Sequence, residues 1–139
     1  IPGVPRGGNH RYGQDCLACH GGYGEGPEFA FAGTVFASPE EDIPVNRAIV
    51  TVTDANGETF DVETNCAGNF YVSLEAFVPA FPLRAEIECP IPDSDTDPDN
   101  DVYERSVMET RISREGACGF CHENAAPSSS SGAPLVLGA

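Results

Sequence analysis

Between residues 29 and 112 the chain alternates short runs of β-branched and aromatic residues with clusters of turn-forming residues. Runs of this length, bounded by Gly, Pro, Asn and Asp, are typical of β-strands. Within the runs apolar and polar positions alternate, as expected for strands with one buried and one solvated face. The pattern predicts an antiparallel β-sandwich of six strands, at residues 31–37, 47–54, 58–65, 69–74, 83–89 and 103–112.

Two of these runs predict which residues face inward. In residues 47–54 one face carries Val50 and Val52, and the other carries Ile49, Thr51 and Thr53. In residues 83–89 the shared face holds Leu83, Ala85, Ile87 and Cys89. Between the second and third runs, Asn56-Gly57 is typical of a tight hairpin turn, because both residues adopt positive φ at low cost. Gly68 marks a similar bend before the fourth run.

A segment within the predicted sandwich resembles a known family of domains. The sequence GTVFASPEEDIPVNRAIVTVTDANGETFDVETNCAGNFYVSL is similar to the carboxypeptidase-regulatory-like domain, which has a G-x-V strand, a Pro-containing turn, an A-x-V-x-V strand and a T-x-x-x-G-x-F hairpin. These motifs are carried here by Gly33, Val35, Pro44, Ala48, Val50, Val52, Thr64, Gly68 and Phe70. The resemblance covers roughly residues 31 to 89 and implies an all-β fold, an Ig-like or transthyretin-like antiparallel β-sandwich. Such domains are scaffolds and imply no chemistry.

The segments on either side of the sandwich differ in composition. The N-terminal segment is rich in Gly and Pro, and the C-terminal one holds four consecutive serines followed by APLVLGA. We therefore divide the chain into an irregular N-terminal arm of residues 1–28, a sandwich domain of residues 29–112 and a C-terminal segment of residues 113–139. The APLVLGA stretch either pairs with a sheet edge, in its own chain or a neighbour's, or stays disordered.

The charge balance narrows the class of partner. The formal net charge is −15, from 22 acidic and 7 basic residues, and every basic residue is Arg. Nucleic acids and anionic lipids bind clusters of Lys and Arg, so we expect neither as a partner. The longest apolar runs have the length of a strand, so no membrane span is predicted. An acidic surface favours solubility or a cationic partner.

Cysteine usage indicates an oxidising compartment. Six cysteines in 139 residues are unusual for the cytosol, where thiols stay reduced. The chain begins Ile-Pro-Gly without an initiator Met, which we interpret as removal of a signal peptide, the alternative being a fragment. We therefore expect a secreted protein, periplasmic or extracellular.

Four of the six cysteines occur in two Cys-x-x-Cys-His motifs. The first is Cys16, Cys19 and His20, and the second is Cys118, Cys121 and His122. The motif supplies two thiols for thioether bonds to one porphyrin and an imidazole for its iron. The two motifs resemble those of small multihaem c-type cytochromes. The resemblance implies two covalently attached haem c groups, electron transfer with other redox proteins or copies of the same chain, and His20 and His122 as iron ligands.

Other chemistries also use paired cysteines. The four motif cysteines together would complete a tetrahedral zinc site, and a Cys-x-x-Cys pair alone occurs in dithiol oxidoreductases. The zinc site leaves both histidines without a role, and the chain lacks the βαβ pattern of the dithiol enzymes. Two of the three histidines in the chain complete these motifs, so haem attachment is the favoured interpretation.

Each haem iron has a second axial position. His10 is the remaining histidine, and we expect it to be the distal ligand of one haem, in its own chain or in trans. Met108 is a weaker choice, because it lies in a strand-like run and its alternative role is core packing. With one spare His, one iron is bound by Met, completed by a partner or left open. An open iron is typical of peroxidase-type enzymes.

Two further features predict structural sites. Cys66 and Cys89 lie outside the motifs, and we predict a disulfide between them that closes a loop of roughly 23 residues and adds about 3 kcal/mol of stability. A loop between the fifth and sixth strands has a carboxylate at every second position, at Asp93, Asp95, Asp97, Asp99 and Asp101. This loop is a candidate Ca²⁺ site, with a solvated acidic loop as the alternative.

The number of strands decides where the two motifs lie. An even number returns the chain to the end where it started, so six strands place both motifs at one end of the sandwich and let two haems pair. An odd number places them at opposite ends, where electron transfer between haems would need subunits joined head to tail in a filament.

Three functions are consistent with the sequence. The first is an extracytoplasmic dihaem electron carrier, either alone or as the subunit of an extracellular cytochrome filament. The second is a haem enzyme with an open iron, and the third is a non-redox structural or adhesive module with zinc or disulfides at the Cys-x-x-Cys pairs.

Overall fold

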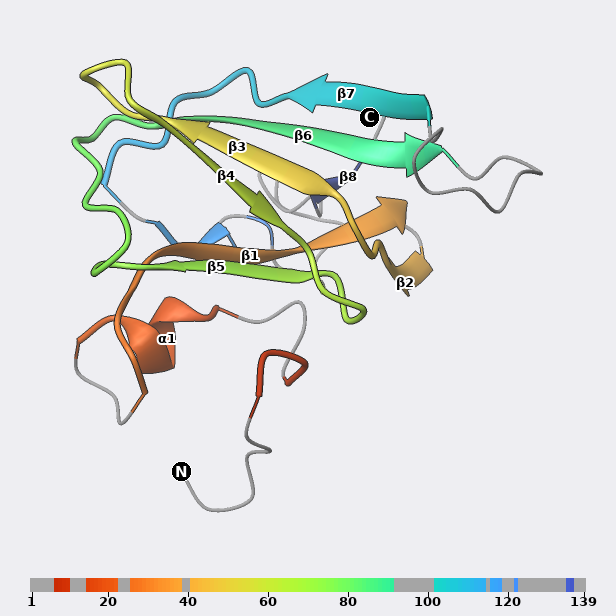
Figure 1. The fold of residues 1–139 in the computed structure, drawn as a ribbon, viewed down its shortest axis with the longest axis horizontal. Coiled ribbons are helices and arrows are strands. Elements are labelled where there is room, and N and C mark those ends of the chain that lie inside the picture. The colour runs from red at the N-terminus through yellow and green to blue at the C-terminus, as the bar shows by residue number, and fades with distance from the viewer. Residues whose placement is uncertain are drawn as a thin grey trace.

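The computed structural model describes residues 7–10, 15–22, 26–38, 41–91, 102–114, 116–118, 122 and 135–136 (Figure 1). Among these residues almost all regular structure is β-strand, and the one described helix, α1 (Leu17–His20), is a single turn. No helix in the described residues is long and apolar enough to cross a membrane. The strands form two layers, which confirms the predicted all-β sandwich.

Each layer has four strands among the described residues. The first sheet has the order β2-β1-β5, with β8 also paired to β1; its strands are β1 (Phe29–Ser38), β2 (Glu41–Pro44), β5 (Asn69–Ser73) and β8 (Leu135–Val136). The second has the order β4-β3-β6-β7; its strands are β3 (Ile49–Thr53), β4 (Thr59–Glu63), β6 (Arg84–Ile91) and β7 (Val102–Val107). The described pairings are antiparallel, except that β8 of the APLVLGA stretch runs parallel to β1 of its own chain.

Apolar side chains between the two sheets form the core. In β3, Val50 and Val52 are buried and the residues between them are partly exposed, as the alternation predicts. The alternate positions of β6 that the pattern places on one face are buried as well. Phe31 and Phe70 are the largest fully buried side chains. Because burying one Val or Phe side chain contributes about 1.5–3 kcal/mol, this interleaved set holds the layers together.

The turn between β3 and β4 differs from the predicted one. Gly57 has a φ of 81°, but Arg47 is the sole non-glycine residue with positive φ in the described chain, so Asn56 does not adopt the expected conformation. The carboxylate of Asp54 holds the turn instead, accepting hydrogen bonds from the N–H groups of Asn56 (2.8 Å) and Glu58 (3.0 Å). A side chain that satisfies the turn amides removes the need for two residues with positive φ.

The structure contains one strand that the pattern does not predict. β2 pairs with the end of β1, with Pro44 opposite Phe36, and its acidic and proline residues lack the apolar alternation of a strand. Seven described strands therefore lie between the two Cys-x-x-Cys-His motifs, one more than predicted.

The chain does not reverse between β2 and β3. β2 runs antiparallel to β1, and β3 continues in the direction of β2 but lies on the other sheet, where it pairs antiparallel with β6. β1 begins where β5 ends, with Phe29 opposite Ser73, and β7 returns to that end, with Val107 opposite Glu86 near the start of β6. The chain enters and leaves the sandwich at one end, on the left in Figure 1. The parity rule is therefore wrong here, although a shared end is found.

The disulfide predicted between Cys66 and Cys89 is not formed. Cys66 is exposed in the turn between β4 and β5, whereas Cys89 is fully buried in β6, and both thiols are free. Burial, with a smaller contribution from Glu104 on the neighbouring strand, raises the pKa of Cys89 to about 11. The strand register turns the Cys89 thiol into the core, whereas Cys66 lies at the surface.

Candidate functional site

The first Cys-x-x-Cys-His motif forms the helical turn α1. The N–H groups of Cys19 and His20 donate to the Cys16 carbonyl at 3.2 and 3.0 Å. Asp15 caps this turn, because its carboxylate accepts hydrogen bonds from the next two free N–H groups at 3.0 and 3.2 Å. Side chains three and four residues apart share a helix face, so the turn directs Cys16, Cys19 and His20 to one side.

The ionisation of the first cysteine distinguishes the motif from a redox dithiol. Burial is the main cause that raises the pKa of Cys16, and the charges of Asp15 and Cys19 raise it further. Cysteines that act as redox nucleophiles have a lowered pKa, set by a helix N-terminus or a cationic neighbour. The surroundings of Cys16 are thus those of a thiol that stays protonated at neutral pH.

His20 is held by three contacts. Its Nδ1 lies 2.7 Å from the Pro27 carbonyl, and because a carbonyl only accepts, Nδ1 carries the proton. The ring stacks on Phe29, with centroids 4.2 Å apart and planes inclined at 15°. Gly26 lies against the ring edge, where an added Cβ would be 2.3 Å from Cε1 of His20. The neutral ring therefore has an unprotonated Nε2, the form in which His binds a metal.

His10 lies beside His20 and is oriented in the same manner. Its Nδ1 donates to the Gly7 carbonyl, so Nε2 is the unprotonated nitrogen of the neutral ring here too. The ring centroids of the two histidines are 6.2 Å apart, with planes inclined at 33°. Two imidazoles that bind one metal ion from opposite sides, each through a nitrogen about 2 Å away, have centroids roughly 6 Å apart. Within the described residues neither Nε2 has a hydrogen-bond partner.

The spacing of the two rings is therefore that of two imidazoles on opposite sides of one metal ion, and the rings lie beside the thiols of the first motif. The predicted residues Cys16, Cys19, His20 and His10 come together within one chain. The structure brings His10 to the first Cys-x-x-Cys-His motif of its own chain, so this pairing needs no neighbouring subunit.

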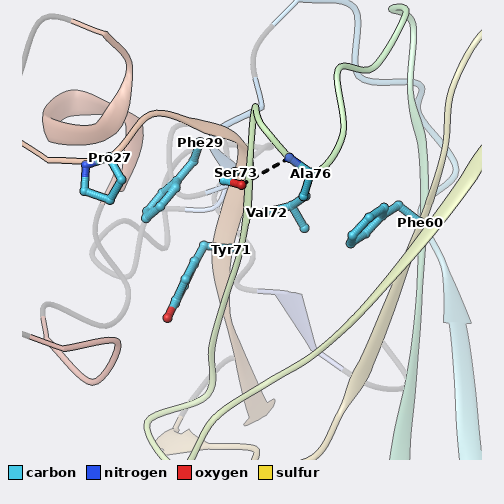
Figure 2. Close-up of a pocket in the computed structure, with 7 residues that line it drawn as sticks. All are labelled: Pro27, Phe29, Phe60, Tyr71, Val72, Ser73 and Ala76. Atoms are coloured by element: carbon cyan, nitrogen blue, oxygen red, sulfur yellow. Dashed lines mark hydrogen bonds between the residues drawn. The ribbon is translucent and has the colours of Figure 1, made fainter.

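An aromatic wall continues from His20 across the first sheet. Phe29 of β1 stacks on Tyr71 of β5, with centroids 4.8 Å apart. Beside them lies an open, mainly apolar hollow of about 390 Å³, lined by Pro27, Phe29, Phe60, Tyr71, Val72, Ser73 and Ala76. Figure 2 shows Phe29 and Tyr71 next to each other, with Phe60 on the far side of the hollow. The wall shields one face of the His20 imidazole from water.

The second motif begins with the same helical hydrogen bond as the first. The His122 N–H donates to the Cys118 carbonyl at 2.9 Å, over the same four-residue spacing. Both are partly buried, and Cys118 packs against the core. Cys121 lies outside the described residues.

The residues before the second motif are anchored to β1. The Ala32 N–H donates to the Gly116 carbonyl at 3.0 Å, and Ala117 forms a bridge with Ala32. Gly33 leaves space for the second motif, because an added Cβ at Gly33 would lie 2.8 Å from Cβ of Cys118.

Both motifs are thus attached to the first half of β1. His20 contacts Phe29, and Cys118 lies against Gly33. These two attachment points are four positions apart along the strand, about 13 Å at the usual rise per residue. The two motifs therefore lie at one end of the sandwich and near each other.

Comparisons with known proteins do not assign the chain to a family. No family model, curated protein or solved structure matches it. The resemblances to carboxypeptidase-regulatory-like domains and to c-type cytochromes therefore rest on the motifs in the sequence alone.

Other predicted site residues lie elsewhere. Met108 packs against the hydrophobic core, and its N–H donates to the Ala85 carbonyl at 3.0 Å. The acidic loop from Asp93 to Asp101 lies outside the described residues. In the described part of the chain no group of three or more His, Cys, Asp or Glu is arranged to hold a metal ion.

Four residues that shape the site were not predicted from the sequence, namely Asp15, Gly26, Asn65 and Asn69. The role of Asp15 could have been predicted from the sequence, because an Asp before a short helical turn typically caps it. Gly26 carries no such signal, because its role depends on how the chain folds back onto the His20 ring. The two asparagines carry none, because each acts through a contact that forms only when the arm folds against the sandwich.

Proposed function

We propose that this protein is an extracytoplasmic dihaem c-type cytochrome that transfers electrons. The observation that carries the proposal is the pair of imidazoles, His10 and His20, 6.2 Å apart beside the thiols of a Cys-x-x-Cys-His turn. Haem c bound there would supply reversible one-electron transfer at its iron. Two imidazoles fill both axial positions, which favours electron transfer over the binding of small ligands.

Each residue of the site has a distinct part in this function. Cys16 and Cys19 hold the haem covalently, and His20 and His10 bind its iron from the two sides. The Pro27 carbonyl fixes the tautomer of His20 and increases its basicity as a ligand. Phe29 keeps water from the face of the imidazole on which it stacks.

The second haem of the proposal belongs to Cys118, Cys121 and His122. Attachment of both motifs to β1 supports electron exchange between two haems of one chain. A filament was needed only if the motifs lay at opposite ends, so the haem pair does not depend on assembly. A net charge of −15 favours redox partners with a cationic docking surface.

Haem content tests the proposal. Produced with a signal peptide in a host that matures c-type cytochromes, the protein should keep two haems per chain after denaturation, with a sharp α-band on reduction. The Cys16→Ala/Cys19→Ala and Cys118→Ala/Cys121→Ala variants should each keep one haem, and the control Cys66→Ala should keep two. A chain without covalent haem would overturn the proposal, and zinc in that chain would support the structural module.

A count of axial ligands favours a second function. Two haem irons have four axial positions, but the chain contains three histidines, so one position per chain lacks a His even in an assembly of this chain alone. Met108 is the only methionine, and it packs against the core. An iron with an open position binds small ligands and supports peroxidase-type chemistry. The haem of His122 is where this function would reside.

Carbon monoxide distinguishes the two functions. If the second haem is open, the reduced protein should bind one CO per chain within the mixing time of the experiment, and His122 should be its trans ligand by resonance Raman spectroscopy. If no CO binds rapidly, both irons have protein ligands and the haem enzyme is ruled out. The Met108→Leu variant then separates a Met ligand, which would be lost, from a ligand supplied by another chain.

A further inference from the structure

We propose that Asn65 and Asn69 are positioning residues that hold His10 in place as the distal ligand of the first haem. The inference rests on the proposed function and adds to it how an irregular arm presents an axial ligand. It also assigns the ligand to its own chain rather than to a neighbouring subunit.

Hydrogen bonds join the two side-chain amides to the main chain of the arm. Nδ2 of Asn69 donates to the carbonyls of Gly8 (3.0 Å) and His10 (3.1 Å). Nδ2 of Asn65 donates to the same Gly8 carbonyl at 2.7 Å. The residues on both sides of position 9 are therefore tied to the sandwich, and His10 is bound through its own carbonyl.

The opposite end of each amide is fixed by the sandwich. Oδ1 of Asn69 accepts a hydrogen bond from the hydroxyl of Thr34 at 2.7 Å, and Asn69 is buried, with 7% of its surface exposed. Oδ1 of Asn65 accepts hydrogen bonds from the N–H groups of Ala67 (3.0 Å) and Asn69 (3.1 Å). Each amide has its oxygen toward the fold and its nitrogen toward the arm, so neither has a reason to rotate.

The arm needs this support because of its sequence. Gly7 and Gly8 precede His10 and lose more conformational entropy on ordering than other residues. Tyr71 leaves no room for a larger residue at position 8, since an added Cβ there would lie 2.9 Å from the Tyr71 hydroxyl. When the arm is ordered before the iron binds, the His10 imidazole already lies beside His20 and no further ordering is needed.

Aspartate substitutions test the two donor groups. Asn65→Asp and Asn69→Asp keep the Oδ1 acceptors within the fold and replace the donating NH₂ group by an oxygen that repels the arm carbonyls. Loss of one such hydrogen bond favours release of the arm about tenfold. The rate at which CO displaces His10 from the reduced first haem should therefore rise about tenfold in Asn65→Asp and further in Asn69→Asp.

Two controls separate positioning from folding. Asn56→Asp makes the same change of charge at an exposed asparagine and should leave the CO rate unchanged. In a His10→Ala background, Asn65→Asp should have no further effect on the first haem, because its effect passes through His10. If Asn69→Asp does not fold, Asn65→Asp, at a partly exposed turn position, carries the test.

Two results would overturn the inference while the haem proposal stands. One is a haem-loaded Asn65→Asp protein with the wild-type CO rate, which would mean that the asparagines only build the turn. The other is a His10→Ala protein with an unchanged low-spin spectrum, which would mean that His10 is not a ligand. A wild-type chain without haem would instead count against the proposed function itself.

Discussion

At the scale of single residues, the two imidazoles are oriented by main-chain carbonyls. Gly7 and Pro27 accept the Nδ1 protons of His10 and His20, and no charged side chain is needed for either contact. A neutral acceptor fixes the tautomer of each imidazole without adding negative charge beside it. Gly26 matters for the same reason, because any side chain there would displace the His20 ring.

The two cysteines outside the motifs should differ sharply in reactivity. Cys66 is exposed, whereas Cys89 is buried with a pKa raised to about 11. Because the thiolate is the reactive form, alkylation of the native protein at pH 8 should label Cys66 within minutes and leave Cys89 unlabelled until the chain unfolds. Mass spectrometry of the labelled peptides is the measurement. If neither thiol is labelled until the protein is reduced, the disulfide predicted between Cys66 and Cys89 is present.

At the scale of elements, β1 organises the candidate site. Phe29 stacks on the imidazole of the first motif, Gly33 leaves space for the second motif, and the Thr34 hydroxyl donates a hydrogen bond to Asn69. The residues from Ala30 to Phe36 are buried without interruption, although β1 belongs to a sheet that alternates elsewhere. A strand that is buried on both faces typically has a continuous apolar sequence. The second sheet covers one face of β1, and parts of the N-terminal and C-terminal segments pack on the first sheet.

Asp54 links two loops at the same end of the sandwich and should make their stability depend on pH. The hydrogen bond from the Ala80 N–H is the main cause that lowers the pKa of Asp54, and those from the β3–β4 turn lower it further. Its contribution is therefore present above the unfolded pKa of about 3.9 and is lost as the pH falls through the lower folded value.

Urea unfolding at several pH values measures this contribution. Asp54→Asn should be less stable than the wild type at neutral pH, and the difference should shrink as the pH falls below about 4. The exposed control Glu75→Gln should show no such convergence. A difference between Asp54→Asn and the wild type that stays constant down to about pH 2 would mean that the carboxylate charge has no part in holding the loops.

At the scale of the whole molecule, the described parts of the two Cys-x-x-Cys-His motifs lie at one end of the sandwich. α1 lies below β1 and β5 in Figure 1, and residues 116–118 run beside β1. This convergence results from strand directions rather than from the number of strands, since β2 and β3 run the same way on different sheets. The chain crosses from one sheet to the other after β2 without reversing, so this short strand adds to the count but not to the number of reversals.

Local pattern was sufficient for the features that depend on a few neighbouring residues. Apolar and polar residues that alternate every two positions are enough to predict the sandwich class and the inward faces of β3 and β6. The spacing within each Cys-x-x-Cys-His motif likewise involves residues no more than four positions apart. The helical turn of the first motif is of the same kind, because its hydrogen bonds and its Asp15 cap lie within six residues. Such contacts form whatever the rest of the chain does.

Tertiary structure alone decided which distant residues meet. Strand register and the crossing between sheets decide three such contacts. They place the ring centroids of His10 and His20 6.2 Å apart, bury Cys89 while Cys66 stays exposed, and let Asn69 hold the arm. These contacts join segments with no shared period, and a shift of one residue in a strand would send each side chain to the other face. The sequence alone therefore determines the two Cys-x-x-Cys-His motifs and the sandwich, whereas packing of the arm on β5 determines that the histidines pair.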